Sequence, residues 1–367
     1  MNNTLDSVCE AVTNVYEQFL EQIDRSIESD PDRKKKYYLI RKGCERTMMF
    51  KIGNLHIKRA YYQDKVTGEY LFLLDKLLNL PKYERLSNTC IKSVIEEATD
   101  SSYKKAGEKA SISAGVSKQT VKNFMHKVKV PQEIVELKKK KEARILHIVA
   151  DEDHVSLQRY GKNRQKIAMP KLIMLYEGVV PDAGEGMSSK RNKVIEKFYF
   201  SGLYKGKNSH KIWERVAEYI EKTYDYEKIE KIYINGDGAA WIKAGCDFIE
   251  KSVFVLDKYH MKSAINDCVA GLEEKIQRDI KDRLYRSLRE LDKREFFRLL
   301  EMSKDFLEGQ KKKAAVEEKI KYLRYHWRAI EIQITDAKYL TGCCAEGQVS
   351  HVLSSRLSSR PLGWSLV

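Results

Sequence analysis

Short apolar segments that alternate with helical patterns between residues 143 and 257 constrain the fold more than any other feature. Helical patterns at 209–223 and 239–249 separate the last three of these segments. Each segment is a short apolar run bounded by polar or turn residues, which predicts strands at 144–150, 171–176, 197–203, 231–235 and 253–256. The predicted order is therefore three strands, then helix–strand–helix–strand, and then helices.

This order is that of the ribonuclease H-like fold, so we expect an α/β catalytic core built on a mixed sheet. In that fold one acidic residue stands on the first strand, a second follows the fourth strand, and a third lies on a later helix. All three meet at one end of the sheet, and the matching positions here are Asp151, Asp237 and Glu346. Asp237 stands between Gly236 and Gly238, and glycines let a backbone or a ligand approach closely.

Each of these acids has an alternative. Strand alternation places Asp151 and Asp153 on one side of the strand, so Asp153 is a substitute or a helper. Glu331, in a helical stretch, competes with Glu346 for the third position. For Asp237 the alternative is a turn-forming residue in a surface loop, because most acidic side chains simply face water.

Carboxylates gathered at one end of a sheet suit chemistry at phosphodiester bonds. Two hard cations about 4 Å apart bind the attacking and the leaving oxygen together. Mg²⁺, with Mn²⁺ as a substitute, takes oxygen ligands and keeps several waters, and a carboxylate cluster is strongly self-repelling without such ions. Asp257 and His260 follow the fifth strand and are expected to support these carboxylates or contact a DNA phosphate; a surface loop with a hydrogen-bonded histidine is the alternative.

A basic pair of short helices is predicted between residues 101 and 130. A helical pattern at 102–111 leads into Ala114-Gly115-Val116-Ser117, a turn that ends on a good N-cap residue, and 118–129 continues as a helix. This is the layout of a helix-turn-helix, whose second helix enters the major groove of DNA. The alternative is a plain helical hairpin with a solvated basic face. The outward polar residues at the start of the second helix are Lys118, Gln119, Lys122 and Asn123.

The region before this element combines helices with a hairpin. Strands at 46–52 and 55–62 flank Gly53-Asn54, a two-residue hairpin signal, and further helices are expected at 71–80 and 87–99. A first helix within residues 1–40 is predicted by apolar residues at helical spacing, Val8, Val12, Val15, Phe19 and Ile23. The predicted domains are a helical and hairpin region at 1–100, the helix-turn-helix and linker at 101–142, the core at 143–265, a helical insertion at 266–340 and a last core helix at 341–367.

The charge balance indicates the class of partner. The chain of 367 residues has 68 Lys and Arg against 53 Asp and Glu, a net charge of +15. Such an excess favours nucleic acid, and a basic enzyme with a solvated surface is the alternative. No apolar run approaches the roughly 20 residues of a membrane span, and the acidic start does not resemble a signal peptide, so we expect a cytoplasmic protein. Seven cysteines without a CxxC pair indicate reduced thiols and no zinc site.

Several segments around these acids resemble the ISLre-type insertion-sequence transposases, long catalogued as an uncharacterised protein family and distantly related to the Mutator-like transposases. The segment at 46–85 resembles them too, so the resemblance covers nearly the whole chain in several blocks in the right order. The segments around the acids are 146–158 (LHIVADEDHVSLQ), 233–245 (YINGDGAAWIKAG), 255–262 (VLDKYHMK) and 342–364 (GCCAEGQVSHVLSSRLSSRPLGW).

The resemblance implies a DDE transposase with a ribonuclease H-like core and a helical insertion before the final acid. It assigns the three family acids to Asp151, Asp237 and Glu346, and a recurring Asp-x-x-His feature to Asp257 and His260. The implied reaction is metal-dependent hydrolysis at the element ends, followed by attack of the freed 3′-hydroxyls on target DNA. The implied partners are the terminal inverted repeats and target DNA, both double-stranded, bound by a homo-oligomer associated with a bacterial nucleoid.

The C-terminus departs from the family pattern. The chain ends 21 residues after Glu346 (367 − 346), where relatives are expected to continue with a basic helical stretch. We expect a copy shortened by a frameshift or a second insertion, with a poorly supported last core helix. Two other functions stay open: an inactive remnant that still binds element ends, and a ribonuclease H-like nuclease that acts on RNA–DNA hybrids or branched DNA.

Overall fold

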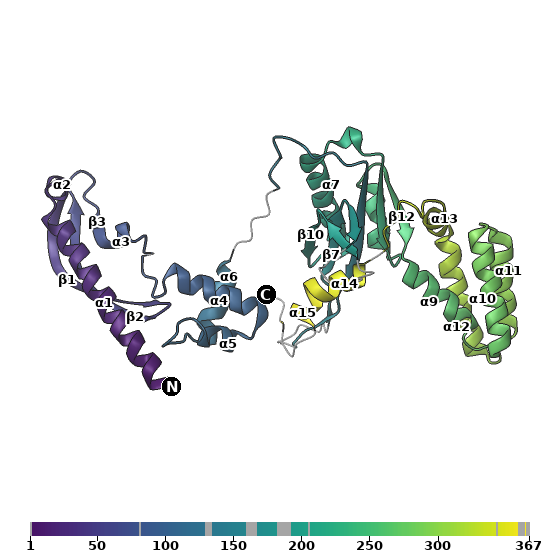
Figure 1. Ribbon diagram of the computed structural model, residues 1–367, viewed down its shortest axis with the longest axis horizontal. Helices are drawn as coiled ribbons and strands as arrows, with labels where there is room; N and C mark the ends of the chain where they lie inside the picture. Colours follow the sequence, from purple (N-terminus) through teal and green to yellow (C-terminus); the bar gives the residue numbers. More distant parts are fainter. Residues whose placement is uncertain are drawn as a thin grey trace. The chain divides into compact units, whose positions relative to one another are not determined.

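The computed structural model describes residues 2–80, 82–128, 134–158, 167–181, 192–204, 206–342, 344–358 and 364. The chain divides into two units, Met1–Pro131 and Gln132–Val367. Figure 1 shows the helices and strands of each.

The first unit begins with a long helix that packs on a β-hairpin. Leu20 of the helix lies in one apolar cluster with Leu55 and Ile57 of the second strand. The three strands form an antiparallel sheet in the order β1-β2-β3. The elements are α1 (Asn2–Ser29), α2 (Pro31–Lys36), β1 (Tyr37–Phe50), β2 (Gly53–Asp64), β3 (Tyr70–Phe72) and α3 (Leu73–Leu77).

The hairpin differs from its prediction in length and in the place of its turn. Phe50 pairs with Gly53, so the turn is Lys51-Ile52 and Gly53 is the first residue of β2. The first strand starts at Tyr37, within the stretch predicted as helical, and the helix predicted at 71–80 spans only Leu73–Leu77. Strand pairing along β1, a strand of fourteen residues, outweighs the local helical pattern around residue 40.

The apolar stripe predicted on the first helix faces the sheet only at its end. Val8, Val15 and Phe19 are each more than half exposed. Ile23, one turn further on, packs beside Leu20 against the apolar cluster of the hairpin. Helical spacing therefore identified the helix correctly but not the face that it buries.

Three short helices form the rest of the first unit. Val94, Ala106 and Val121, one from each helix, lie in their shared core. A serine caps each helix by accepting a backbone N–H, and a Cβ at Gly107 would lie 2.2 Å from the Val116 carbonyl oxygen, so only glycine permits this approach. The helices are α4 (Asn88–Asp100), α5 (Tyr103–Glu108) and α6 (Lys118–Lys127).

A five-stranded mixed sheet is the centre of the second unit. Its spatial order is β10-β7-β4-β11-β12, and β4, β11 and β12 run parallel while β7 and β10 pair antiparallel. The strands are β4 (Ile145–Glu152), β7 (Lys171–Tyr176), β10 (Phe198–Gly202), β11 (Lys231–Gly236) and β12 (Ser252–Leu256). Two small hairpins that the sequence analysis missed are β5 (Val155–Ser156) with β6 (Ile167–Ala168) and β8 (Gly178–Pro181) with β9 (Asn192–Ile195).

Helices cover both faces of this sheet. Trp213 of α7 (Lys211–Thr223) packs on Ile148 and its neighbours on one face. On the other face, Ala345 of α14 (Ala345–Val349) packs on Val149. Alternate residues of β4 thus serve opposite faces, as strand geometry requires. A short helix after β11 and a turn at the C-terminal end complete these layers, α8 (Ala240–Lys243) and α15 (Ser355–Leu357).

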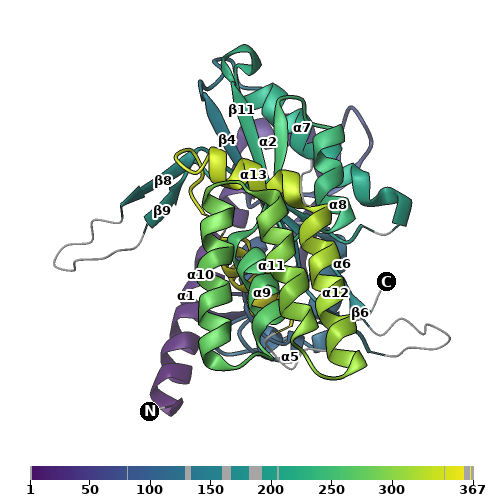
Figure 2. The same ribbon diagram turned by 90° about the vertical axis from the view of Figure 1, so that its right-hand side faces the viewer.

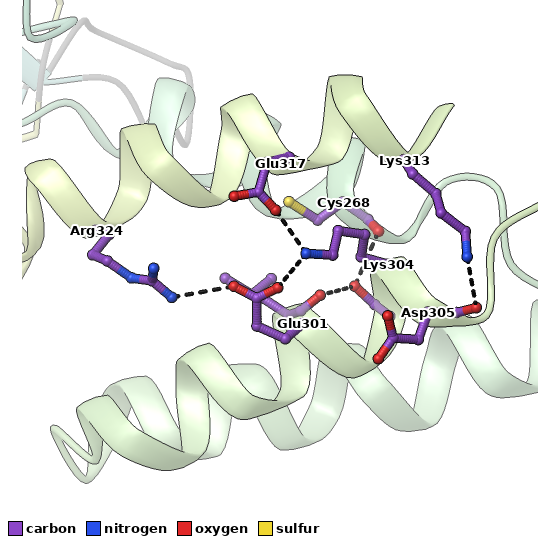
Figure 3. Close-up of polar contacts among 9 residues, drawn as sticks. Cys268, Glu301, Lys304, Asp305, Lys313, Glu317 and Arg324 are labelled. Carbon is purple, nitrogen blue, oxygen red and sulfur yellow. Dashed lines mark hydrogen bonds and ion pairs between the residues drawn. The ribbon is translucent and has the colours of Figure 1, made fainter. Parts of the chain in front are cut away.

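A helical insertion separates β12 from α14. Figure 2 shows α9 to α12 side by side, and α13 then returns to the sheet beside β12. Lys304 donates at 2.6 Å to both Glu301 and Glu317, and Arg324 pairs with Glu301, which joins two of the helices (Figure 3). The helices are α9 (Lys258–Val269), α10 (Glu274–Arg289), α11 (Lys293–Asp305), α12 (Gln310–Tyr325) and α13 (Trp327–Thr335). Over the described ranges, no helix has the length and apolar character needed to cross a bilayer.

Candidate active site

The ends of three parallel strands bring three acids to one edge of the sheet. Asp151 is the penultimate residue of β4, Asp237 directly follows β11, and Asp257 directly follows β12. The strands lie in register, and the backbone N–H of Asp257 donates to the Gly236 carbonyl at 2.9 Å. Since the carboxyl ends of neighbouring parallel strands share an edge, these acids form one cluster.

The pKa of Asp151 reflects the other charges of that cluster. Burial raises the pKa of its carboxyl group, and the nearby charge of Asp237 raises this pKa further. A hydrogen bond from the Glu152 backbone N–H at 2.8 Å and the neighbouring His260 both act in the opposite direction. The carboxylates of Asp151 and Asp237 are therefore close enough to repel one another.

Asp237 lies in a tight loop that glycine makes possible. Its Oδ1 accepts the backbone N–H of Ala239 at 2.8 Å. Gly238 has φ +96°, and a Cβ there would lie 2.5 Å from Nε2 of His326. A close approach was predicted at Gly236 and Gly238. At Gly238 the approaching group is a side chain of the helical insertion, and at Gly236 it is the side chain of Ile242.

Asp257 and His260 stand together at the start of α9. The Asp257 carboxylate caps the helix by accepting the backbone N–H of Tyr259 at 3.1 Å, and His260 Nε2 lies 3.9 Å from its Oδ2. Burial raises the pKa of Asp257; Glu346 and Asp237 raise it further, whereas the hydrogen bond and His260 lower it. Asp257 is thus within electrostatic range of Asp237 and Glu346.

Glu346 joins the cluster from the far end of the chain. It lies exposed in the first turn of α14, and it is close enough to raise the pKa of Asp257. Ala345, its neighbour, holds the helix on the sheet beside the strand that carries Asp151. The competing acid Glu331 instead accepts the indole N–H of Trp327 at 2.6 Å within its own helix.

Asp153 has a different environment from Asp151. Its carboxylate accepts the backbone N–H of His154 at 2.8 Å and the hydroxyl of Ser358 at 2.9 Å. Strand β4 ends at Glu152, so the alternation that would place Asp153 beside Asp151 does not extend to it. Asp153 thus holds Ser358, the residue that directly follows α15.

Two residues of the insertion contact the cluster without any signal in the sequence. The Tyr322 hydroxyl donates to the backbone carbonyl of Asp237 at 2.6 Å, and the buried His326 packs against Gly238. A cavity of about 360 Å³ lies here between Asp237, His260 and α12. Burial lowers the pKa of His326 to about 4, with a further contribution from Lys243, so the ring is neutral near pH 7.

The donor chemistry of the cluster fits Mg²⁺ or Mn²⁺. All four acids offer hard oxygen ligands, and their repulsion at close range is what a divalent cation relieves. Within the described part of the chain, however, no three His, Cys, Asp or Glu side chains are grouped closely enough to hold one ion. The side chains would have to draw together around a cation.

The residues predicted to contact DNA lie on α6 in the first unit. Lys118, Gln119, Lys122 and Asn123 are all exposed at the surface. The Gln119 side-chain amide donates to the Asn123 side-chain carbonyl at 2.9 Å. The four side chains therefore form one polar surface over the first two turns of this helix.

Fold and site together define a mixed α/β protein with a carboxylate cluster at the edge of its sheet. The model of an uncharacterised protein family, UPF0236, matches residues 2–366, and the chain belongs to this family. Two UPF0236 proteins of Caldanaerobacter subterraneus subsp. tengcongensis are 38% and 37% identical over 353 and 349 residues. Each alignment covers 95% of this chain and 70% of the relative.

Among solved structures, the Drosophila P element transposase strand transfer complex is similar to this chain. The TM-score is 0.27 and the sequence identity 12%, over 72% of this chain and 66% of that chain. A likeness at this level carries no argument about function. The predicted membership in a family catalogued as uncharacterised is confirmed, and the narrower resemblance to insertion-sequence transposases stays a prediction.

Proposed function

We propose that this protein is a DNA transposase of the DDE class, which cuts element ends and joins the freed 3′-hydroxyls to target DNA. The observation that carries the proposal is that Asp151, Asp237 and Asp257 lie at the ends of three parallel strands, with Glu346 of α14 close enough to raise the pKa of Asp257. Carboxylates at such an edge suit hard divalent cations bound beside a phosphate.

The topology of the sheet supports a ribonuclease H-like core. Numbered along the chain, its strands have the spatial order third, second, first, fourth, fifth, and the first, fourth and fifth are parallel. Helices lie on both faces, and the bundle between β12 and α14 occupies the place of an insertion before the last acid. These features are those that the sequence-based prediction requires.

In this proposal the four acids have two different roles, metal binding and helix capping. Asp151, Asp237 and Glu346 hold Mg²⁺, and Asp257 fixes the start of α9 so that His260 lies at the same edge. Bound cations stabilise the attacking and leaving oxygens of the phosphodiester. His260 is half-exposed and is free to contact a phosphate of the DNA.

The first unit supplies sequence recognition in this proposal. The packing of α4, α5 and α6 around one small core supports the predicted helix-turn-helix. Replacing Lys122 by Ala is expected to weaken binding to all duplexes and to reduce the log–log salt slope by about 1. Replacing Lys92 by Ala, on α4, makes the same charge change away from α6 and serves as the control in gel-shift titrations.

The direct test uses a labelled duplex that carries the element's own end, incubated with Mg²⁺ or Mn²⁺. Metal-dependent nicks at the end, lost in Asp237→Asn while binding is kept, are the expected result. Nicking by Asp237→Asn at the wild-type rate would contradict the assignment of this acid. An RNA–DNA hybrid cut in preference to duplex DNA would favour the alternative nuclease.

A second function, DNA binding without cleavage, is favoured by one observation. Among the described residues, the acids are not grouped closely enough for three to hold one ion. Binding of the end without nicking at any Mg²⁺ or Mn²⁺ concentration would favour this function. For an active transposase we expect at least a dimer on DNA, because two ends must be held together.

A further inference from the structure

The helical insertion reaches the acidic cluster through the C-terminal end of α12. The hydroxyl of Tyr322 donates to the backbone carbonyl of Asp237, which lies 85 residues earlier in the chain. The Tyr322 ring also lines the cavity that contains Asp237 and His260. One hydrogen bond thus links the insertion to the backbone of a candidate metal ligand.

His326 packs against the loop that follows Asp237. It is 5% exposed, and its ring packs against that of Tyr322, with 4.8 Å between the ring centroids. Its Nε2 occupies the space next to Gly238 that a Cβ would need. Since Gly238 has φ +96° and no side chain, the loop after Asp237 depends on this neighbour for its position.

Helix α13 and the residue after it form hydrogen bonds with strands β11 and β12. The buried Gln333 side chain donates to the backbone carbonyl of Leu256, the residue before Asp257. Asp336, just after α13, accepts from Lys231 at 2.6 Å and from Tyr233 at 2.8 Å, both on β11. The insertion therefore contacts both strands whose ends carry Asp237 and Asp257.

We infer that Tyr322 is a positioning residue through which the insertion sets Asp237 for binding a divalent cation. The inference rests on the proposed function. The Asp237 carboxylate accepts from Ala239 and the Asp237 carbonyl accepts from Tyr322, so the residue is held on both sides of its Cα. Without the hydroxyl, the Asp237 carbonyl loses this hydrogen bond, and the carboxylate is held only by the N–H of Ala239, so its direction is less well fixed.

The test replaces Tyr322 by Phe, which removes the hydroxyl and keeps the ring. The Kd for Mn²⁺, measured by electron paramagnetic resonance without DNA, is expected to rise about tenfold, or about 1.4 kcal/mol. The Mg²⁺ concentration for half-maximal nicking should shift by a similar factor. Nicking at saturating Mg²⁺ should return to within about twofold of the wild type, because the defect lies in metal binding.

Tyr325→Phe is the matched control, since Tyr325 lies three residues further on the same helix and is mostly exposed. It should leave both metal measurements unchanged. A Tyr322→Phe protein with an unchanged Kd for Mn²⁺, whether or not its Tm falls, would overturn the inference while the proposed function stands. Wild-type protein that neither binds Mn²⁺ nor nicks DNA would overturn the proposed function and the inference with it.

Discussion

The two halves of the acidic cluster are held in different ways. Asp237 and Asp257, here called the clamped half, are held by directional hydrogen bonds. Tyr322 donates to the carbonyl of Asp237, and Gln333 donates to the carbonyl of Leu256 just before Asp257. Both donors belong to the end of the insertion, so this half depends on a large helical bundle.

Asp151 and Glu346 are here called the packed half. Asp151 lies within strand β4, and Glu346 depends mainly on apolar contacts between its short helix and the sheet. Val349 and Leu353 pack with Leu172 of β7. Apolar contacts stabilise in proportion to buried area but specify no direction, whereas hydrogen bonds fix the position of an atom. The backbone positions next to Asp237 and Asp257 are therefore fixed closely. Glu346 in the packed half can adjust its position around a cation.

The largest loss of nicking is expected at Gly238, because His326 leaves no space there for a side chain. Gly238→Ala places a Cβ 2.5 Å from His326 Nε2 at a φ of +96°, a conformation that costs about 1–3 kcal/mol for other residues. Metal-dependent nicking should fall at least about 100-fold, equal to about 2.7 kcal/mol in the barrier. Single-turnover nicking assays measure this loss.

Gly309→Ala is the control for backbone strain. Gly309 has φ +89° and no atom within 4 Å of an added Cβ, so it meets the strain without the clash. This variant should be less stable and still nick DNA. An equal loss of nicking in both variants would mean that general destabilisation, and not the contact with His326, explains the effect.

In the packed half, Leu353 lies in a π-helical turn, Ser350–Ser354, that continues α14. Leu353→Ala should therefore loosen the helix that carries Glu346. Leu353 is buried, and such truncations cost about 2–5 kcal/mol. Hydrogen exchange should rise for amides 345–357, and nicking should fall about tenfold. Leu307→Ala removes a similarly buried leucine from the helical bundle. It should destabilise without a selective rise at 345–357, and equal exchange in both variants would contradict the comparison.

The sequence predicted where the strand-end acids lie better than it predicted which contacts hold them. Apolar strand patterns placed Asp151, Asp237 and Asp257 at strand ends, because such ends follow from local periodicity. The contacts of Tyr322 and His326 could not be predicted, since an aromatic residue and a histidine at helical spacing look the same whether they face a core or an active site. In the sequence, Gly238 indicated that some group approaches the backbone closely. It could not indicate that this group is His326.

Strand pairing explains the other departures. The hairpin turn falls at Lys51-Ile52 although Gly53-Asn54 is the better turn sequence, because the register of β1 and β2 over many residues decides where the chain reverses. Asp153 lies outside β4, which ends at Glu152, an end that the composition of the segment does not mark. Pairing between strands distant in the sequence sets the hairpin turn and the end of β4. Local sequence patterns carry no information about that pairing.

A pH-dependent effect should appear in both halves. The raised pKa values of Asp151 and Asp257 mean that the folded state binds their protons more tightly than the unfolded state. Stability therefore falls as pH rises from about 3.8 through each raised pKa. Asp151→Asn should raise the Tm at pH 7 by about 2–4 °C.

Asp257→Asn should act in the same direction, because asparagine also caps a helix. Both gains should shrink as pH falls toward 4, and Mg²⁺ should raise the Tm of the wild type more than that of either variant. Scanning calorimetry between pH 4 and pH 7 measures these differences. A gain that grows on acidification would show that the charge of these carboxylates is not the cause.

The smallest effect is expected from Tyr199→Phe, which repeats in the packed half the change made at Tyr322. The Tyr199 hydroxyl donates to the Gln348 side chain on α14 at 2.5 Å, so its loss should cost about 1 kcal/mol of stability. Because apolar contacts also hold α14, the Kd for Mn²⁺ should stay within about twofold of the wild type. A tenfold rise in that Kd would mean that both halves are positioned by hydrogen bonds, and the distinction between them would fail.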